Sequence, residues 1–258
     1  RDRSGNSAHY DAVIESLEAR GLRVIPAFAS GLDARPAVKA FFMDRGEPIV
    51  DAVVSLTGFS LVGGPAYNDT DAAQEMLEAL DVPYLAVQGL EFQSLQDWES
   101  SSMGLMPVEA TMMVAIPELD GATGSMVFGG RSELSAGEKF DMQPAPERID
   151  RLADRVARLV ALRHTPIAER KVAIVLFNFP PNSGAAGTAA HLSVFESLFN
   201  TLSAMREEGY HVDLPDSHAE LRDAILKGNA KRYGAEANVF QRVPVDDHVR
   251  AEPWLAEI

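Results

Sequence analysis

The chain has 258 residues, 46% of them hydrophobic, so it is long enough to bury a core as one large domain or two small ones. Acidic residues outnumber basic ones 38 to 23, and the formal net charge of −15 argues against nucleic acid as a partner, because backbone binding needs clustered Lys and Arg. No stretch approaches the roughly 18 apolar residues of a membrane span. The absence of cysteine excludes disulfides and thiolate chemistry, and it fits the reducing cytoplasm, where we expect the protein.

Helices and strands alternate through the first half of the sequence. Apolar residues at helical spacing predict a first helix that ends at Gly21. In chain order there follow a strand over LRVIPAFA (22–29), a helix over 36–46, a buried strand DAVVSL (51–56), a helix over 69–80 capped by Asp69 or Thr70, and a buried strand VPYLAV (82–87). About thirty residues for each strand and helix is typical of a parallel, doubly wound sheet.

The second half begins with a less regular region. Residues 88–144 combine a helix around Val108–Val114 with turns at Asp120-Gly121 and Gly129-Gly130. The remaining predicted elements are a helix through 149–159, a buried strand VAIVLFNF (172–179), a helix over 187–208, a short strand HVDL (211–214) and a helix over 218–228.

These elements predict an α/β fold made of two doubly wound, mostly parallel-sheet units, similar to Rossmann or periplasmic-binding-protein lobes. We expect a first α/β unit over 1–144, a connecting helix and linker over 145–170, and a second, incomplete α/β unit over 171–258.

The stretch FPPNSGAAGT is the first candidate ligand loop, because it separates a predicted strand from a predicted helix. Ligands of parallel sheets sit beyond the carboxyl ends of strands, where helix N-termini present unpaired N–H groups. The candidate lining residues are Asn182, Ser183, Gly184, Gly187 and Thr188. The alternative is a tight turn in which Thr188 caps the helix. GAAGT lacks the Lys of a P-loop, so we do not expect ATP to bind here.

A second loop, LTGFSLVGGPAYND (56–69), also follows a predicted strand and precedes a helix. Gly63, Gly64 and Asn68 could line the same crevice, although the glycines do not form G-x-G-x-x-G. An ordinary loop with glycines at positive φ is the alternative. His191 is the histidine nearest the first loop, and it is either an acid, base or ligand contact or a partly buried structural residue.

Other chemical signals are weak. None of the six histidines lies in H-E-x-x-H spacing, so no metal site is predicted in this chain. No nucleophile–base pair is recognisable, and the catalytic residues stay unknown. Four methionines, Met103, Met106, Met112 and Met113, gather near Val108. Thioethers suit a flat apolar ligand, but an irregular core is the favoured explanation.

Four long strings carry a family resemblance across nearly the whole chain. They are VDAVVSLTGFSLVGGPA (50–66), LDVPYLAVQGLEFQSLQDW (80–98), AIPELDGATGSMVFGGR (115–131) and RKVAIVLFNFPPNSGAAGTAAHLSVFESLFNTL (170–202). The sequence resembles the large, porphyrin-binding (H-type) subunit of magnesium chelatase, the enzyme of chlorophyll and bacteriochlorophyll biosynthesis. The cobaltochelatase large subunit is the nearest competitor, but PPNSGAAGTAAHLSVF looks like the magnesium branch.

The resemblance implies ATP-dependent insertion of Mg²⁺ into protoporphyrin IX. In that enzyme ATP is hydrolysed on partner AAA+ subunits, while the porphyrin is bound by the large subunit. We expect this chain to be an internal piece of such a subunit, without a cofactor of its own and inactive alone. The alternative role is a non-catalytic scaffold or docking module for the AAA+ partners. No family site residue maps onto a matching motif here.

Overall fold

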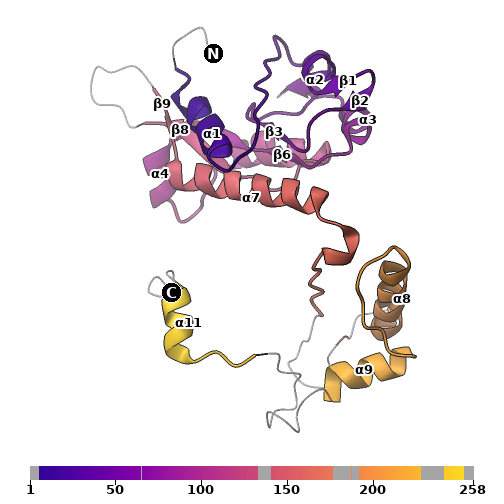
Figure 1. Ribbon diagram of the computed structural model, residues 1–258. Helices are drawn as coiled ribbons and strands as arrows, with labels where there is room; N and C mark the ends of the chain where they lie inside the picture. Colours follow the sequence, from indigo (N-terminus) through magenta and orange to yellow (C-terminus); the bar gives the residue numbers. More distant parts are fainter. Residues whose placement is uncertain are drawn as a thin grey trace. The chain divides into compact units, whose positions relative to one another are not determined.

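Figure 1 shows the computed structural model of the chain. The structure describes residues 6–64, 66–132, 141–176, 187, 192–227 and 241–252. The chain divides into two compact units, Arg1–His164 and Thr165–Ile258. The domain limits expected from the sequence stay a prediction. Among the described helices, none has the length and apolar character needed to cross a membrane.

The centre of the first unit is a set of parallel strands. β3 (Val53–Ser55) pairs in parallel with β6 (Tyr84–Ala86). β7 (Gln88–Ser94) follows β6 after one residue and pairs in parallel with β8 (Val127–Arg131), whose other edge takes β9 (Met142–Pro144) in antiparallel orientation. The continuous stretch that contains β6 and β7 therefore pairs with two different strands, because β6 pairs with β3 and β7 pairs with β8. Helices connect these parallel strands, and the α/β class is confirmed.

Two long helices cover one part of these strands. α1 (Ala8–Glu18) and α7 (Pro146–His164) pack against each other and against β8. The apolar residues that they share with the strands form one core cluster, which includes Leu17, Phe128, Leu152 and Val156. The helices are also joined by polar contacts, because the Arg20 guanidinium donates to the Asp154 carboxylate at 2.6 Å. The predicted helix through 149–159 is confirmed as part of α7.

A second core cluster lies around α3 (Thr70–Leu80), which buries Ala73, Met76 and Leu80. The Asp69 carboxylate caps this helix by accepting from the Ala72 N–H at 3.1 Å, as the sequence predicted. Next to α3 lie α2 (Arg35–Phe41) and two antiparallel hairpins. The hairpin strands are β1 (Met43–Asp44) with β2 (Glu47–Pro48), and β4 (Gly63–Gly64) with β5 (Tyr67–Asn68).

The irregular region predicted after β6 contains an unbroken helical segment of mixed type. α4 (Leu95–Ser100) follows β7 directly. Further on, α5 (Pro107–Glu109) continues into a π-helix (Ala110–Ala115) and then into α6 (Ile116–Leu119). The predicted helix near Val108 is therefore present, but its middle is wound with the wider i→i+5 pattern.

In the second unit the described residues are helical or irregular. The elements are a 3₁₀ turn (Ile167–Glu169), α8 (Val194–Glu207), α9 (His218–Lys227) and α11 (Val245–Ala251). Leu221 is the one buried residue among the described part of this unit. An extensive core is therefore absent from what the structure describes here.

Three expected strands are corrected. Residues 22–29 form no strand; Pro26 cannot donate to a ladder, and Leu22 and Val24 pack against the core without pairing. Residues 172–176, the described part of the run 172–179, are irregular and mostly exposed, with Val175 at 92% exposure. Residues 211–214 are irregular as well. Apolar content predicted strands at all three places, but a strand also needs a neighbouring edge to pair with.

Candidate functional site

The loop after β3 holds the second set of candidate residues. Gly63 has φ +134°, and a Cβ there would lie 2.4 Å from the Tyr67 carbonyl oxygen, so only glycine fits this close approach. Gly64 packs against the Leu32 side chain. The Asn68 amide donates to the Thr70 hydroxyl at 2.7 Å, at the start of α3. These three candidates shape the β4–β5 hairpin, and a role in ligand binding stays a prediction.

The other candidate loop falls almost entirely outside the described residues. Asn182, Ser183, Gly184, Thr188 and His191 are not among them, so their proposed roles also stay predictions. Gly187 has φ +68°, and a Cβ there would lie 3.1 to 3.3 Å from atoms of Phe195 and Val194. Glycine at this position therefore allows the backbone to pass close to the first turn of α8.

A buried aspartate ties the loop after β3 to the end of α6. Asp120 is 1% exposed, and its Oδ2 accepts from the Ser60 hydroxyl at 2.6 Å and from the Leu61 N–H at 2.8 Å. Ser60 in turn accepts from the Val62 N–H at 3.2 Å. Two donors on one carboxylate oxygen thus fix residues 60–62. Buried charge is tolerated here because hydrogen bonds replace lost hydration.

The second oxygen of this carboxylate has a different environment. Asp120 Oδ1 and the Tyr84 hydroxyl are both buried, and neither has a hydrogen-bond partner among the described residues. Burial raises the pKa of Tyr84 to about 12; the Ser55 side chain lowers it, and the nearby negative charge of Asp120 adds to the rise. The tyrosine therefore stays neutral at ordinary pH, near the Asp120 carboxylate.

A buried glutamate is the centre of a second hydrogen-bonded cluster, at the carboxyl end of β7. Glu109 is fully buried, and its Oε1 accepts from the Phe92 N–H at 3.4 Å. Its Oε2 accepts from the Met106 N–H at 3.2 Å and from the side-chain amide of Gln93. Glu109 is the third residue of α5, so the contact with Met106 also caps that helix. One carboxylate thus holds the end of β7 beside the start of α5.

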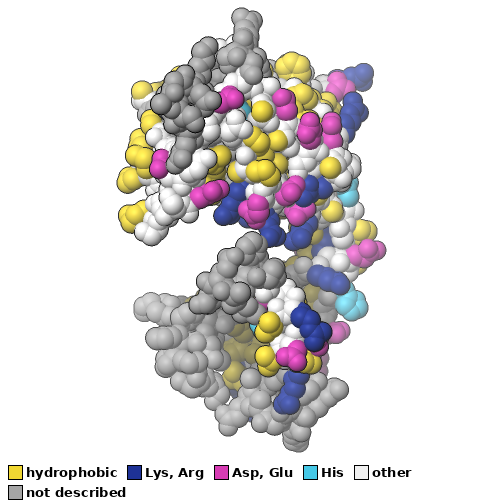
Figure 2. All heavy atoms as spheres, turned by 90° about the vertical axis from the view of Figure 1, so that its left-hand side faces the viewer, with side chains coloured by type: hydrophobic (Ala, Val, Ile, Leu, Met, Phe, Trp, Pro, Cys, Tyr) yellow, Lys and Arg dark blue, Asp and Glu magenta, His cyan; other side chains and the backbone are white. Residues whose placement is uncertain are grey.

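Two of the residues held by Glu109, Phe92 and Met106, carry exposed apolar side chains, and so do Met103 and Val108, which are close to Met106 in the sequence. We call Phe92, Met103, Met106 and Val108 the methionine patch; their exposed fractions are 52%, 85%, 41% and 39%. Core packing, the explanation favoured from the sequence, is therefore wrong for Met103 and Met106. It is right for Met113, which is buried against Gly58. Figure 2 shows the face of the first unit that carries α4, where hydrophobic side chains lie between acidic ones.

Neither buried carboxylate is among the candidate residues named from the sequence. Glu109, Met113, Pro117 and Asp120 are all buried and follow one another at helical spacing. A helical wheel over 107–120 would have placed the two acids on the apolar stripe. Within the described part of the chain, no three His, Asp or Glu side chains lie close enough together to hold a metal ion.

A solved structure has a related fold. The catalytic subunit of cobaltochelatase from Mycobacterium tuberculosis superimposes with a TM-score of 0.67 and 28% sequence identity, over 88% of this chain and 19% of that chain. The class defined by the fold is therefore that of large metal-chelatase subunits. The family model CobN/Magnesium Chelatase matches residues 3–257, and the chain belongs to this family.

Curated relatives agree with this assignment and with the resemblance found in the sequence. The H-type subunit of magnesium chelatase from Cereibacter sphaeroides is 53% identical over 99% of this chain. The chloroplastic ChlH subunit of magnesium chelatase from Oryza sativa subsp. indica is 39% identical over 95% of this chain. The chain spans 22% and 18% of these two relatives, about a fifth of their length.

Proposed function

We propose that this chain is a segment of the H-type subunit of a magnesium chelatase, an ATP-dependent ligase that inserts Mg²⁺ into protoporphyrin IX. One observation carries the proposal, the 53% identity to the H-type subunit from Cereibacter sphaeroides over 99% of the chain. The solved cobaltochelatase subunit is 28% identical, so the sequence favours magnesium over cobalt. ATP is hydrolysed on AAA+ partner subunits in this proposal, and the complex works in the cytoplasm in chlorophyll or bacteriochlorophyll synthesis.

The part played by this segment is proposed to be support of the porphyrin. Metal insertion requires bases that remove two pyrrole protons and groups that replace the tightly held waters of Mg²⁺. Glu109 and Asp120 are fully enclosed and already accept two or three hydrogen bonds each, so we assign them a positioning role. The methionine patch offers what a flat macrocycle needs, polarizable and aromatic side chains on a braced backbone.

A segment exchange tests the family role. The matching fifth of the Cereibacter sphaeroides H-type subunit is replaced by this chain, and magnesium insertion is followed by fluorescence with the partner subunits present. We expect the chimera to retain activity, because 53% identity preserves the internal contacts. The control chimera carries the matching segment of the Mycobacterium tuberculosis cobaltochelatase and should be inactive. Equal activity of the two chimeras would contradict the assignment to magnesium chelatase over cobaltochelatase. Measurable magnesium insertion by this chain without the rest of the subunit would contradict its role as a segment.

A porphyrin titration tests the methionine patch. Trp98 lies on α4, which directly follows the strand that carries Phe92, so tryptophan fluorescence should be quenched saturably by a soluble porphyrin. Phe92→Ala should weaken binding about tenfold, because a buried aromatic contact contributes about 1.5–3 kcal/mol. Phe41→Ala is the matched control, since Phe41 is exposed to a similar degree, 48% against 52% for Phe92. Quenching that does not saturate, or equal loss in both variants, would favour the alternative role as a scaffold or docking module for the AAA+ subunits.

A further inference from the structure

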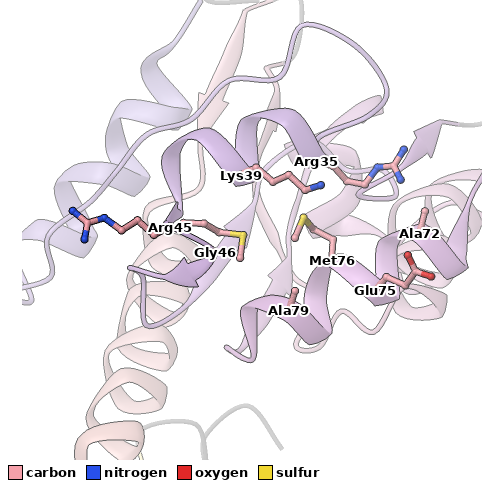
Figure 3. A pocket seen from close by; sticks show the side chains of 9 residues that line it. Arg35, Lys39, Arg45, Gly46, Ala72, Glu75, Met76 and Ala79 are labelled. Atoms are coloured by element: carbon pink, nitrogen blue, oxygen red, sulfur yellow. The ribbon is translucent and has the colours of Figure 1, made fainter.

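A pocket of about 460 Å³ lies between α2, the β1–β2 hairpin and α3, away from the methionine patch (Figure 3). Its lining includes the side chains of Met43, from the hairpin, and Met76, from α3. Three basic residues surround it, namely Arg35, Lys39 and Arg45. A concentration of positive charge is unusual in a chain with a net charge of −15, and nothing in the proposed porphyrin site uses it.

Arg35 is already occupied. Its guanidinium binds the Asp33 carboxylate in a bidentate ion pair, with contacts of 2.7 Å to Oδ2 and 2.9 Å to Oδ1. This hydrogen bonding lowers the pKa of the Asp33 carboxyl below its usual value. Glu75, the one acidic residue of the lining, also acts on Arg35 through its charge. The two carboxylates therefore compensate Arg35, and its charge is not available for a ligand.

Lys39 differs from Arg35 in this respect. It lies one turn further along α2, and its ammonium makes no ion pair or hydrogen bond with the described residues, although its charge acts on Asp33 at longer range. Figure 3 shows the amine extended across the pocket toward Met76, whereas the Arg45 guanidinium points away from both. An ammonium without an ion pair, beside two methionine side chains, is complementary to a molecule that has a negative head and an apolar body.

We propose that this pocket binds a small organic carboxylate, with Lys39 as the anchor of the carboxylate and Met43 and Met76 in contact with the apolar part. The volume is large enough for an aromatic or short aliphatic acid, at the lower end of the range of small-molecule sites. Arg45 raises the local positive potential without touching the ligand, because its side chain is directed outward. The site is independent of the chelatase proposal.

Methionine methyl NMR on the full chain tests the site, with benzoate as the probe. Benzoate should shift the Met43 and Met76 methyl resonances saturably, with a Kd in the millimolar range that one charged contact and a small apolar area provide. Benzamide has the same shape without the charge and should bind at least about tenfold more weakly. Inorganic phosphate has charge without an apolar body and should leave both methyls nearly unshifted. The Met103 methyl, in the methionine patch, reports any general effect of the ligand.

Lys39→Gln should raise the Kd for benzoate about tenfold, since it removes the charged partner but keeps the length of the side chain. Lys171→Gln is the matched control; it makes the same change in net charge at an exposed position of the second unit and should leave the Kd unchanged. The methyl spectrum without ligand shows whether each variant is folded. Benzamide that binds as tightly as benzoate, equal effects of the two lysine variants, or no saturable shift at Met43 and Met76 would each overturn the proposal.

Discussion

Glu109 and Asp120 are two buried carboxylates on one helical stripe, and they are satisfied in different ways. Glu109 uses both oxygens, one for the Phe92 N–H and the other for the Met106 N–H and the Gln93 amide. Asp120 uses one oxygen for both of its donors, and its other oxygen has no partner among the described residues. The first site requires two acceptor atoms, whereas the second requires only one.

This difference shows at which of the two positions a carboxylate is needed and at which an amide can replace it. At Glu109 the carboxylate is needed because a neutral amide of the same shape cannot accept on both sides. At Asp120 an amide can keep its oxygen toward Ser60 and Leu61 and turn its NH₂ toward the unpartnered side. The two regions should therefore respond differently to the same chemical change.

The largest effect is expected from Glu109→Gln. The new NH₂ group must replace one of the two carboxylate oxygens. It then faces either the Phe92 N–H or the two donors of Oε2, the Met106 N–H and the Gln93 amide, so at least one buried donor loses its acceptor. We expect the free energy of unfolding to fall by about 3 kcal/mol. Urea denaturation of both proteins measures it. Unchanged stability would show that the site does not need two acceptor oxygens, and the two-acceptor description would then be wrong.

Gly63→Ala tests the loop that Asp120 holds. The added Cβ would meet the Tyr67 carbonyl oxygen and the Asn68 Cα at about 2.5 Å, at a φ that alanine disfavours, so we expect a loss of about 2 kcal/mol. Gly64→Ala is the matched control, because its nearest neighbour is the end of the exposed Leu32 side chain, which can move. Equal melting temperatures for the two variants would show that the hairpin adapts, and that the Asp120 anchor does not fix its geometry.

The pH dependence of stability tests the burial of Tyr84 near Asp120. The native pKa of Tyr84 is raised from 10.0 to about 12, so the native state keeps a proton that the unfolded chain loses above pH 10. The stabilisation is complete below the unfolded pKa and is lost as the pH rises toward the native one. Between about pH 9 and pH 11, the wild type should lose about 1.4 kcal/mol more stability than Tyr84→Phe. If the free energy of unfolding falls equally with pH in the two proteins, the Tyr84 hydroxyl is not buried as described.

The smallest effect is expected from Asp120→Asn. Its oxygen can keep the Ser60 and Leu61 contacts, so the loss of stability should stay below about 1 kcal/mol, well under that of Glu109→Gln. Removal of the charge should also lower the native pKa of Tyr84, which ultraviolet titration of the phenol measures. A loss as large as that of the Glu109 variant would erase the distinction between the two sites.

Local patterns in the sequence predicted much of the first unit. The Asp69 cap, the helical spacing of Ile149, Leu152 and Val156, and the apolar runs of β3 and β6 are all confirmed, because each depends on residues close together in the chain. The strand expected over 22–29 was wrong because pairing depends on distant neighbours.

The candidate site was less predictable. Glycines in the loop after β3 were correctly noted, but their hairpin and the close approach at Gly63 depend on residues that fold back onto them. The buried acids were missed because acidic side chains are normally solvated. Their burial depends on hydrogen-bond donors that are far away in the sequence, such as Ser60 for Asp120. The pocket at Lys39 depends on three separate elements, so no single stretch of sequence reveals it.

The π-helix between the two acids has a consequence for insertions and deletions. Its extra residue per turn sets the angle at which Asp120 leaves the helix relative to Glu109. A π-turn accommodates one residue more than an α-turn, so deleting one residue from Ala110–Ala115 can restore ordinary α-helical winding with Asp120 still directed toward Ser60. A one-residue insertion has no such compensation and would turn Asp120 by about 100° around the axis, away from Ser60. Loss of one residue from this stretch should therefore be tolerated better than gain of one.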